Sequence, residues 1–197
     1  MMAKLKNGRA KLFVISAPSG TGKTTLCNKL LRDGLGLVNS VSMTTRKPRP
    51  GEKEGVDYYF VTRKRFEDMI SKKGFLEYEE NFGNLYGTPR DFVEKNLKKG
   101  RNVLLSIDVK GAMKVRRAYP ARSVLIFILP PSARVLKTRL HLRRSDSPEE
   151  VARRLALAKK ELSYKDKYDY RIVNNRLDAS YRRLRKIVEK ELEDCER

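Results

Sequence analysis

Residues 13–26, with the sequence FVISAPSGTGKTTL, constrain the fold of this chain more than any other segment. An apolar run is followed by a turn that contains two glycines, and then by Lys-Thr-Thr. This order predicts a buried strand, a tight loop and a helix from residue 23 to about residue 32. The loop fits the phosphate-binding pattern G-x-x-x-x-G-K-[ST], except that Ala17 stands where the first glycine is usual.

The chemistry of phosphate binding accounts for the residue types in this loop. The first turn of a helix has unpaired N–H groups that attract an anion, and glycines such as Gly20 and Gly22 let those groups converge. Lys23 can reach the terminal phosphates, and the hydroxyl of Thr24 can bind Mg²⁺. Alternatively, the glycines only shape a strand–turn–helix. The residues predicted to contact a nucleotide's phosphates are Ala17, Pro18, Ser19, Gly20, Thr21, Gly22, Lys23, Thr24 and Thr25.

Apolar runs alternate with segments of helical periodicity along the rest of the chain, which predicts one α/β domain with a central parallel sheet flanked by helices. The expected strands cover residues 11–16, 38–46, 57–61, 75–81, 102–108, 123–129 and 168–174. The expected helices cover residues 23–32, 62–73, 88–100, 131–144, 145–162 and 178–194. Residues 82–87 are expected to form a turn, with Thr88 capping the next helix and Pro89 as its first residue.

Composition narrows the class of protein further. The chain has 197 residues, of which 40% are hydrophobic, and this suits one globular domain. Its longest apolar runs are too short to span a bilayer, and the basic N-terminal segment lacks the apolar stretch of a secretory signal. Two cysteines, Cys27 and Cys195, allow at most one disulfide, so we expect reduced thiols and a cytoplasmic location. A single histidine, His141, argues against a structural zinc site.

The charge of the chain is unusually positive. Lysine and arginine number 45 against 24 acidic residues, which gives a formal net charge of +21. Such a charge attracts polyanions of any kind, including nucleic acid, nucleotides and acidic lipid head groups. A charged surface without a partner explains the same composition, so charge alone leaves these alternatives open.

Two further groups of residues complete the candidate site. Asp108 follows an apolar run, where a carboxylate could help to hold Mg²⁺ or could cap the next helix. Arg46 and Arg49 lie three residues apart around a proline and could clamp a second phosphate, although isolated arginines are usually solvated. They belong to the constrained pattern S-x-T-T-R-x-P-R-x-G-E-x-x-G-x-D-Y at residues 42–58.

With this pattern, the chain closely resembles the guanylate kinases, which transfer a phosphoryl group from ATP to GMP. The resemblance runs from residue 12 to about residue 189. The blocks that carry it are SAPSGTGKTTL, SVSMTTRKPRPGEKEGVDYYFV, FLEYEENFGNLYGTP, IDVKGA, FILPPS and DYRIVNN. The resemblance implies a P-loop kinase fold with a core at about residues 1–36, 97–130 and 168–197, a GMP-binding insert at about 37–96 and a mobile helical lid at about 131–167.

The resemblance also assigns residues to GMP. It implies that Glu77 accepts hydrogen bonds from guanine N1–H and the N2 amino group, which adenine cannot offer side by side. Taken alone, Glu77 would be interpreted as a surface charge on a half-exposed strand. The residues that the resemblance places around GMP are Ser42, Arg46, Arg49, Tyr58, Glu77, Tyr86, Thr88 and Asp108.

On the ATP side the resemblance implies that Asn174 lies near adenine, and that a basic lid closes over the phosphates. The lid arginines are Arg134, Arg139, Arg143, Arg144, Arg153 and Arg154, of which Arg143 and Arg154 match the family best. The catalytic residues implied are Lys23, Arg46, Asp108, Arg143 and Arg154, and the metal ligands are Thr24 and Asp108. Ser106, Lys110, Arg144 and Asn175 depart from the family pattern.

The kinase hypothesis predicts ATP and Mg²⁺ as cofactors and GMP as the acceptor, without a specific nucleic acid or a membrane as partner. Three alternatives remain at this point. Related domains that lack a working phosphate loop bind phosphorylated peptides, but this chain keeps Gly20, Gly22, Lys23 and Thr24. A nucleic-acid-binding protein is suggested by the charge alone. A kinase for another small phosphate ester is the third alternative, and Glu77 argues against it.

Overall fold

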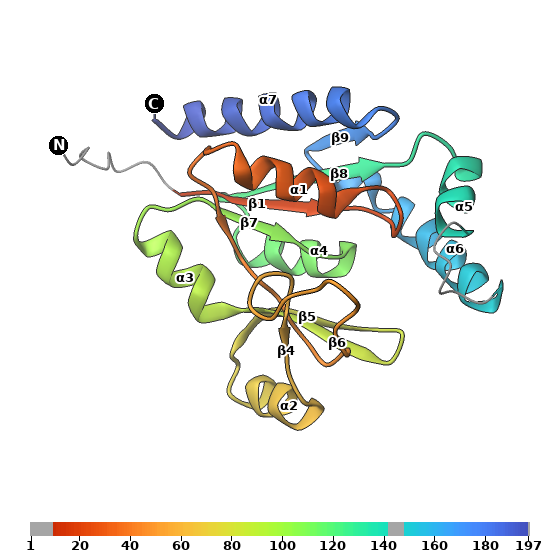
Figure 1. Ribbon diagram of the computed structural model, residues 1–197. Helices are drawn as coiled ribbons and strands as arrows, with labels where there is room; N and C mark the ends of the chain where they lie inside the picture. The colour runs from red at the N-terminus through yellow and green to blue at the C-terminus, as the bar shows by residue number, and fades with distance from the viewer. Residues whose placement is uncertain (1–9, 142–147, 197) are drawn as a thin grey trace.

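A computed structural model describes residues 10–141 and 148–196 of the chain. Within these residues a five-stranded sheet lies between helices, and a smaller four-stranded sheet lies beside it (Figure 1). The strand order in the large sheet is β2-β7-β1-β8-β9, and each neighbouring pair is parallel. Its strands are β1 (Leu12–Ser16), β2 (Val38–Asn39), β7 (Val103–Ser106), β8 (Ser123–Leu129) and β9 (Tyr170–Val173).

Each face of the large sheet is covered by a different pair of helices, because successive side chains along a strand point to opposite faces. Leu12 and Val14 belong to the core cluster that includes α3 and α4. Phe13 and Ile15 belong to the cluster formed with α1 and α7. The covering helices are α1 (Lys23–Arg32), α3 (Arg90–Lys98), α4 (Val109–Ala118) and α7 (Leu177–Glu196). This arrangement confirms the predicted α/β class.

Parallel pairing also gathers the carboxyl ends of the strands at one edge of the sheet. In β1 and β7, Leu12 pairs with Val103 and Ile15 pairs with Ser106. The loop after β1, which the sequence predicts to bind phosphate, and the Asp108 segment after β7 therefore leave the sheet side by side. Ligands of open α/β sheets bind at this edge.

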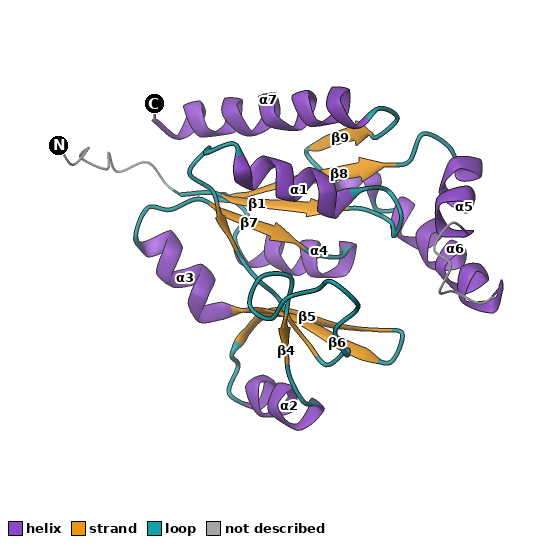
Figure 2. Cartoon of the chain, viewed as in Figure 1, coloured by secondary structure: helices purple, strands orange, loops and turns teal. Residues whose placement is uncertain are grey.

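The smaller sheet forms a separate layer with a core of its own. Its order is β4-β3-β6-β5, with parallel β3–β4 pairing and antiparallel β3–β6 and β5–β6 pairing. Figure 2 shows α2 on the side of this sheet away from the large one. Its elements are β3 (Met43–Thr44), β4 (Tyr59–Phe60), α2 (Arg63–Ser71), β5 (Phe75–Asn81) and β6 (Asn84–Pro89). Its buried core residues are Met43, Phe66, Phe75 and Leu85.

Two more helices, α5 (Ala133–His141) and α6 (Pro148–Leu162), pack on each other at one end of the large sheet (Figure 1). Leu136, Leu140 and Val151 are part of their common core. A short 3-10 helix, η1 (Lys165–Lys167), leads back to β9. The serine cap expected before Pro148 lies outside the described residues.

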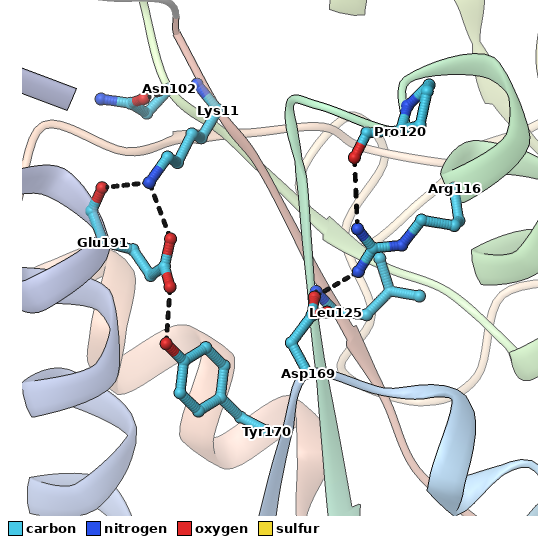
Figure 3. Close-up of polar contacts among 8 residues, drawn as sticks. All are labelled: Lys11, Asn102, Arg116, Pro120, Leu125, Asp169, Tyr170 and Glu191. Carbon is cyan, nitrogen blue, oxygen red and sulfur yellow. Dashed lines mark hydrogen bonds and ion pairs between the residues drawn. The ribbon is translucent and has the colours of Figure 1, made fainter. Parts of the chain in front are cut away.

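The last helix is tied to the beginning of the first strand by a half-buried polar cluster (Figure 3). Lys11 donates to the carboxylate of Glu191 at 2.7 Å, and the Tyr170 hydroxyl donates to the same carboxylate at 2.6 Å. Asp169 next to it pairs with Arg116 and accepts the backbone N–H of Leu125. These contacts join α7, β9, β8 and the start of β1.

Two predicted elements are wrong. The strand expected over residues 38–46 is two strands, because the chain leaves the large sheet after β2 and enters the small one at β3. The turn expected over residues 82–87 is limited to Phe82 and Gly83, which have φ of 51° and 74°. Positive φ at both central residues suits a two-residue hairpin turn, and the following residues pair with β5 as β6.

The cap predicted for α3 is also wrong. Pro89 is the N-cap, and the helix begins at Arg90. The Thr88 side chain is not available for capping, because its hydroxyl donates to Glu77 at 2.5 Å. Among the helices of the described ranges, none is long and apolar enough to cross a membrane.

Candidate active site

The loop after β1 has the backbone geometry that the sequence predicts. Gly20 and Gly22 have φ of 85° and 89°, in the left-handed region where a side chain would be strained. Ala17 has negative φ, since Lys73 and Phe82 are the non-glycine residues of the described ranges with positive φ. An alanine therefore fits the first position of the motif without strain.

Lys23 at the start of α1 points along the edge of the sheet. Its ammonium donates to the carbonyl oxygen of Ile107 at 3.3 Å, so it lies beside the segment that follows β7. Burial lowers the pKa of Lys23, while the charges of nearby acidic groups, Asp108 and Glu161 among them, oppose this shift. Thr24 and Thr25 follow on the exposed side of the helix.

Asn174 holds the backbone of the loop after β1 through a hydrogen bond. Its side-chain amide donates to the carbonyl oxygen of Thr21 at 2.7 Å, and Asn174 is buried. A Cβ at Gly22 would approach the Asn174 amide nitrogen to 2.6 Å, so only glycine fits at this position. This observed contact of Asn174 is with the loop backbone, whereas the resemblance implies a place near adenine.

A cavity of about 250 Å³ connects the loop to the small sheet. Lys23 and Asp108 line it from the large sheet, and Glu77 lines it from β5. Its lining residues are Ala17, Ser19, Lys23, Ser42, Arg49, Tyr58, Glu77, Glu79, Asn81, Phe82, Tyr86, Gly87, Ser106, Ile107, Asp108, Arg154, Leu157 and Glu161. The structure thus brings most of the predicted GMP residues into one space with Lys23 and Arg154.

Glu77 is buried, so its interpretation as a surface charge is wrong. It is 6% exposed and accepts the Thr88 hydroxyl hydrogen bond. Burial raises the pKa of Glu77 to about 7, against the opposing effect of the Thr88 hydrogen bond. A Cβ at Gly111 would lie 2.4 Å from the second Glu77 oxygen, so Gly111 leaves the room that this carboxylate needs.

The predicted phosphate clamp is organised by a residue that sequence reasoning missed. Glu52 accepts a hydrogen bond from Arg46 at 2.8 Å and one from the backbone N–H of Arg49 at 2.7 Å. Burial alone would lower the pKa of Arg46, but the hydrogen bond and charge of Glu52 outweigh burial and raise it. Arg46 lies over the Tyr58 ring, 5.4 Å from its centroid, and is not part of the cavity wall among the described residues.

Asp108 serves as the N-cap of α4. One of its oxygens accepts the backbone N–H of Gly111 at 2.8 Å, and the other accepts the side-chain amide of Asn81 at 2.8 Å. The helix-cap alternative therefore describes its structural role, and the carboxylate still lines the cavity beside Lys23. Asn81 at the end of β5 was missed, because its partner is distant in sequence.

The lid arginines differ in position. Arg154 lines the cavity, Arg139 donates to the carbonyl oxygen of Asn174 at 3.4 Å, and Arg134 and Arg153 are exposed. Arg143 and Arg144 lie outside the described residues. Sequence reasoning also missed Glu161 on α6, although its helical spacing from the apolar Leu157 and Ala158 places it on the buried face.

The comparisons with known proteins agree with this geometry. The family model described as guanylate kinase matches residues 9–191. The chain belongs to the guanylate kinase family.

Its relatives within that family match over most of their length. A guanylate kinase of Wolbachia pipientis wMel is 51% identical over 180 residues, covering 91% of this chain and 90% of its own. One from Thermus thermophilus is 50% identical over 176 residues, or 89% and 78% of the two chains. The crystal structure of the guanylate kinase from Anaplasma phagocytophilum superposes with a TM-score of 0.79 at 39% identity, covering 93% and 87%. The predicted family and its P-loop kinase fold are confirmed.

Proposed function

We propose that this protein transfers the γ-phosphoryl group of ATP to GMP, and that the residues of the cavity described above perform the transfer. The observation that carries the proposal is that Lys23 of the phosphate-binding loop and the buried Glu77 face the same cavity of about 250 Å³. A nucleotide bound at Glu77 in this cavity would lie next to a phosphate donor bound at Lys23.

On the ATP side, the loop would hold the phosphates through its backbone N–H groups, and Lys23 would neutralise their charge. The residues given to ATP are Ala17, Pro18, Ser19, Gly20, Thr21, Gly22, Lys23, Thr24, Thr25 and Asn174. Asn174 would act by fixing the loop through Thr21, in addition to its place near adenine.

On the GMP side, Arg46, Arg49, Tyr58 and Tyr86 would hold the phosphate. The rings of Tyr58 and Tyr86 meet edge to face with centroids 5.9 Å apart, and the Arg46 guanidinium lies over the Tyr58 ring. Since Glu52 holds the Arg46 guanidinium in this arrangement, a bound phosphate would have to compete with that carboxylate for it.

Guanine would be recognised by Glu77, with Thr88 and Ser42 at its edge. An ionised carboxylate accepts the two adjacent N–H groups of guanine, whereas adenine would place a ring nitrogen against it. Because Glu77 is buried, a mispaired base would leave its oxygens unsatisfied, and such a mismatch discriminates strongly.

The residues at the loop fit Mg²⁺ as well as ATP. Among the described residues there is no cluster of three or more acidic, histidine or cysteine side chains that could hold a metal. Mg²⁺ does not need one, since it commonly binds through one or two protein oxygens, phosphates and waters. Thr24 would supply a hydroxyl and Asp108 a carboxylate, and the ion would neutralise charge on the phosphates.

The transfer itself needs positioning and positive charge more than a strong base. Lys23, Arg46, Arg154 and, from the sequence, Arg143 would stabilise the charge on the transferring group. Asp108 would hold the two halves of the site together through its bonds to Gly111 and Asn81.

ATP labelled at its γ-phosphate tests the proposal. With GMP present, we expect the label in GDP, and we expect a Lys23→Ala variant to lose this transfer while keeping its fold. Label released only as inorganic phosphate would contradict phosphoryl transfer to GMP. Binding of GMP without any loss of label from ATP would instead support a non-catalytic binding module.

A further inference from the structure

One face of strand β5 lies against helix α4 at the edge of the cavity. Alternate residues of a strand share a face, so Glu77, Glu79 and Asn81 point to the same side of β5, and all three line the cavity. Helix α4 is fixed to the large sheet, because Val109 and Val115 are buried in the core cluster that includes residues of β1 and β7. A bond between β5 and α4 therefore joins the small sheet to the large one.

Two side-chain contacts make this connection. Lys114 of α4 pairs with the carboxylate of Glu79 at 2.6 Å. At the end of β5 the side-chain amide of Asn81 donates to Oδ2 of Asp108 at 2.8 Å. The first contact is an ion pair of two charged side chains, and the second reaches a carboxylate that lines the cavity together with Lys23. The two contacts can therefore differ in what they do for the site.

The side chain of Asp108 is held by two different parts of the molecule. Its Oδ1 accepts the backbone N–H of Gly111 in its own helix at 2.8 Å, and its backbone carbonyl oxygen accepts the Ser16 hydroxyl of β1 at 3.3 Å. The last torsion of an aspartate side chain is broad, so a bond to one oxygen leaves the direction of the other loosely defined. The amide of Asn81 fixes that second oxygen, and it comes from the small sheet.

We propose that Asn81 is a positioning residue, whose amide fixes Oδ2 of Asp108 in the cavity when β5 lies against α4. The proposal rests on the proposed function, because it treats Asp108 as a group of the phosphoryl-transfer site. The orientation of this carboxylate at the edge of the large sheet then depends on the place of the small sheet, which would hold GMP. The two nucleotide sides of the site are thus linked by a side-chain hydrogen bond.

Steady-state kinetics with GMP and Mg·ATP test this role. Asn81→Leu keeps about the size of the side chain and removes the donor. We expect its kcat to fall roughly tenfold, because Asp108 loses a hydrogen bond of the charge-assisted kind, while KM for either nucleotide changes by less than about threefold. Asn81→Asp has the shape of the parent residue and places a second carboxylate against Asp108, so its kcat should be lower still.

Two further variants separate positioning from a general loss of packing. Asn84→Leu removes another amide of the same hairpin, which donates to the carbonyl oxygen of Phe82, and it should behave as the parent. Lys114→Met breaks the contact with Glu79 and leaves the bond to Asp108 in place, so we expect a higher KM for GMP with kcat unchanged. Asn81→Leu would overturn the proposal if it had this second phenotype or the kinetics of the parent, and so would Asn81→Asp with a kcat above that of Asn81→Leu.

A double-mutant cycle shows whether Asn81 acts through Asp108. Asp108→Ser removes the carboxylate and keeps a hydroxyl that can cap α4. In this background we expect Asn81→Leu to have no further effect on kcat, and a further loss of roughly tenfold would overturn the proposal. Turnover of the parent decides the proposed function separately. A parent that turns over GMP beside an equally active Asn81→Leu contradicts the proposal alone, whereas a parent without transfer to GMP overturns both.

Discussion

A carboxylate that recognises guanine must be ionised, since only the charged form accepts both N–H groups. Burial disfavours the charged form of Glu77 and raises its pKa, so Glu77 is not ionised at every pH near neutrality. The proposed reading of the base therefore makes GMP binding sensitive to pH in the neutral range.

We expect the affinity for GMP to rise as pH increases from about 6 to about 8, by roughly tenfold, since Glu77 ionises with a pKa of about 7. Binding titrations over this range check it. Glu77→Gln should bind GMP roughly a hundredfold more weakly and lack this step, although the phosphate of GMP itself still titrates. A pH profile shared by the parent and Glu77→Gln would contradict the assignment.

The hydroxyl of Thr88 tunes the same carboxylate, since its hydrogen bond opposes the rise in the Glu77 pKa. Thr88→Val keeps the shape of the side chain and removes the donor, so the pH dependence of GMP binding should shift upward by about one unit. Thr88→Ser is the matched control and should keep the parent profile. The pH profiles of GMP binding decide this, and identical shifts in both variants would show that the hydroxyl is not responsible.

At the scale of elements, the small sheet and α2 have a core separate from that of the large sheet. Phe66 is fully buried in it and stacks on Phe75 with ring centroids 4.3 Å apart. Leu76 of β5 joins the two sheets, because it packs in the core of the large sheet. Phe66 belongs to the small core alone, so we expect a change there to affect the small sheet first.

Phe66→Ala should destabilise this element by about 3–5 kcal/mol, because it removes a large buried ring. We expect GMP binding to be lost while Mg·ATP binding at the phosphate loop remains. Calorimetric titrations with each nucleotide measure the difference, and Val56→Ala, at an exposed position of the same region, serves as the control. Equal loss of both nucleotides would mean that the small sheet does not fold independently of the large one.

Some of these helices and strands could be predicted from the sequence, and others could not. The helix expected over residues 23–32 is observed as α1 with those bounds, because the glycine turn and helix start are local signals. From the sequence, the residues of β6 are predicted to form a turn and a helix cap, because the pairing of β6 with β5 and the hydrogen bond between Thr88 and Glu77 are not local. Residue chemistry alone likewise left Glu77 on the surface, and only the family resemblance placed it at GMP.

At the scale of the whole molecule, the two buried glutamates link stability to pH. Glu77 and Glu161 both have pKa values raised to about 7 by burial, above the ordinary value near 4.5. A group with a raised pKa holds more protons in the folded state than in the unfolded state at intermediate pH. Its stabilising contribution is therefore complete below about pH 4.5 and is lost as pH rises through about 7.

We expect the stability of the parent, relative to a Glu77→Gln/Glu161→Gln double variant, to fall by about 5 kcal/mol between about pH 5 and about pH 8. The net charge of +21 makes the stability of both proteins depend on pH in a similar way. We therefore use the difference in stability between the parent and the double variant, in which this common effect cancels. Urea unfolding at several pH values measures it. A constant difference across this range would mean that neither carboxyl group is held neutral by burial.

Turnover with different acceptors tests the central claim most directly. ADP release with Mg·ATP is followed while GMP, AMP, UMP, CMP and dTMP are offered separately. We expect rapid release with GMP alone, since only guanine presents both donors to Glu77. Comparable release with AMP or a pyrimidine nucleotide would contradict the assignment of guanine recognition to Glu77, even with the phosphate loop working as proposed.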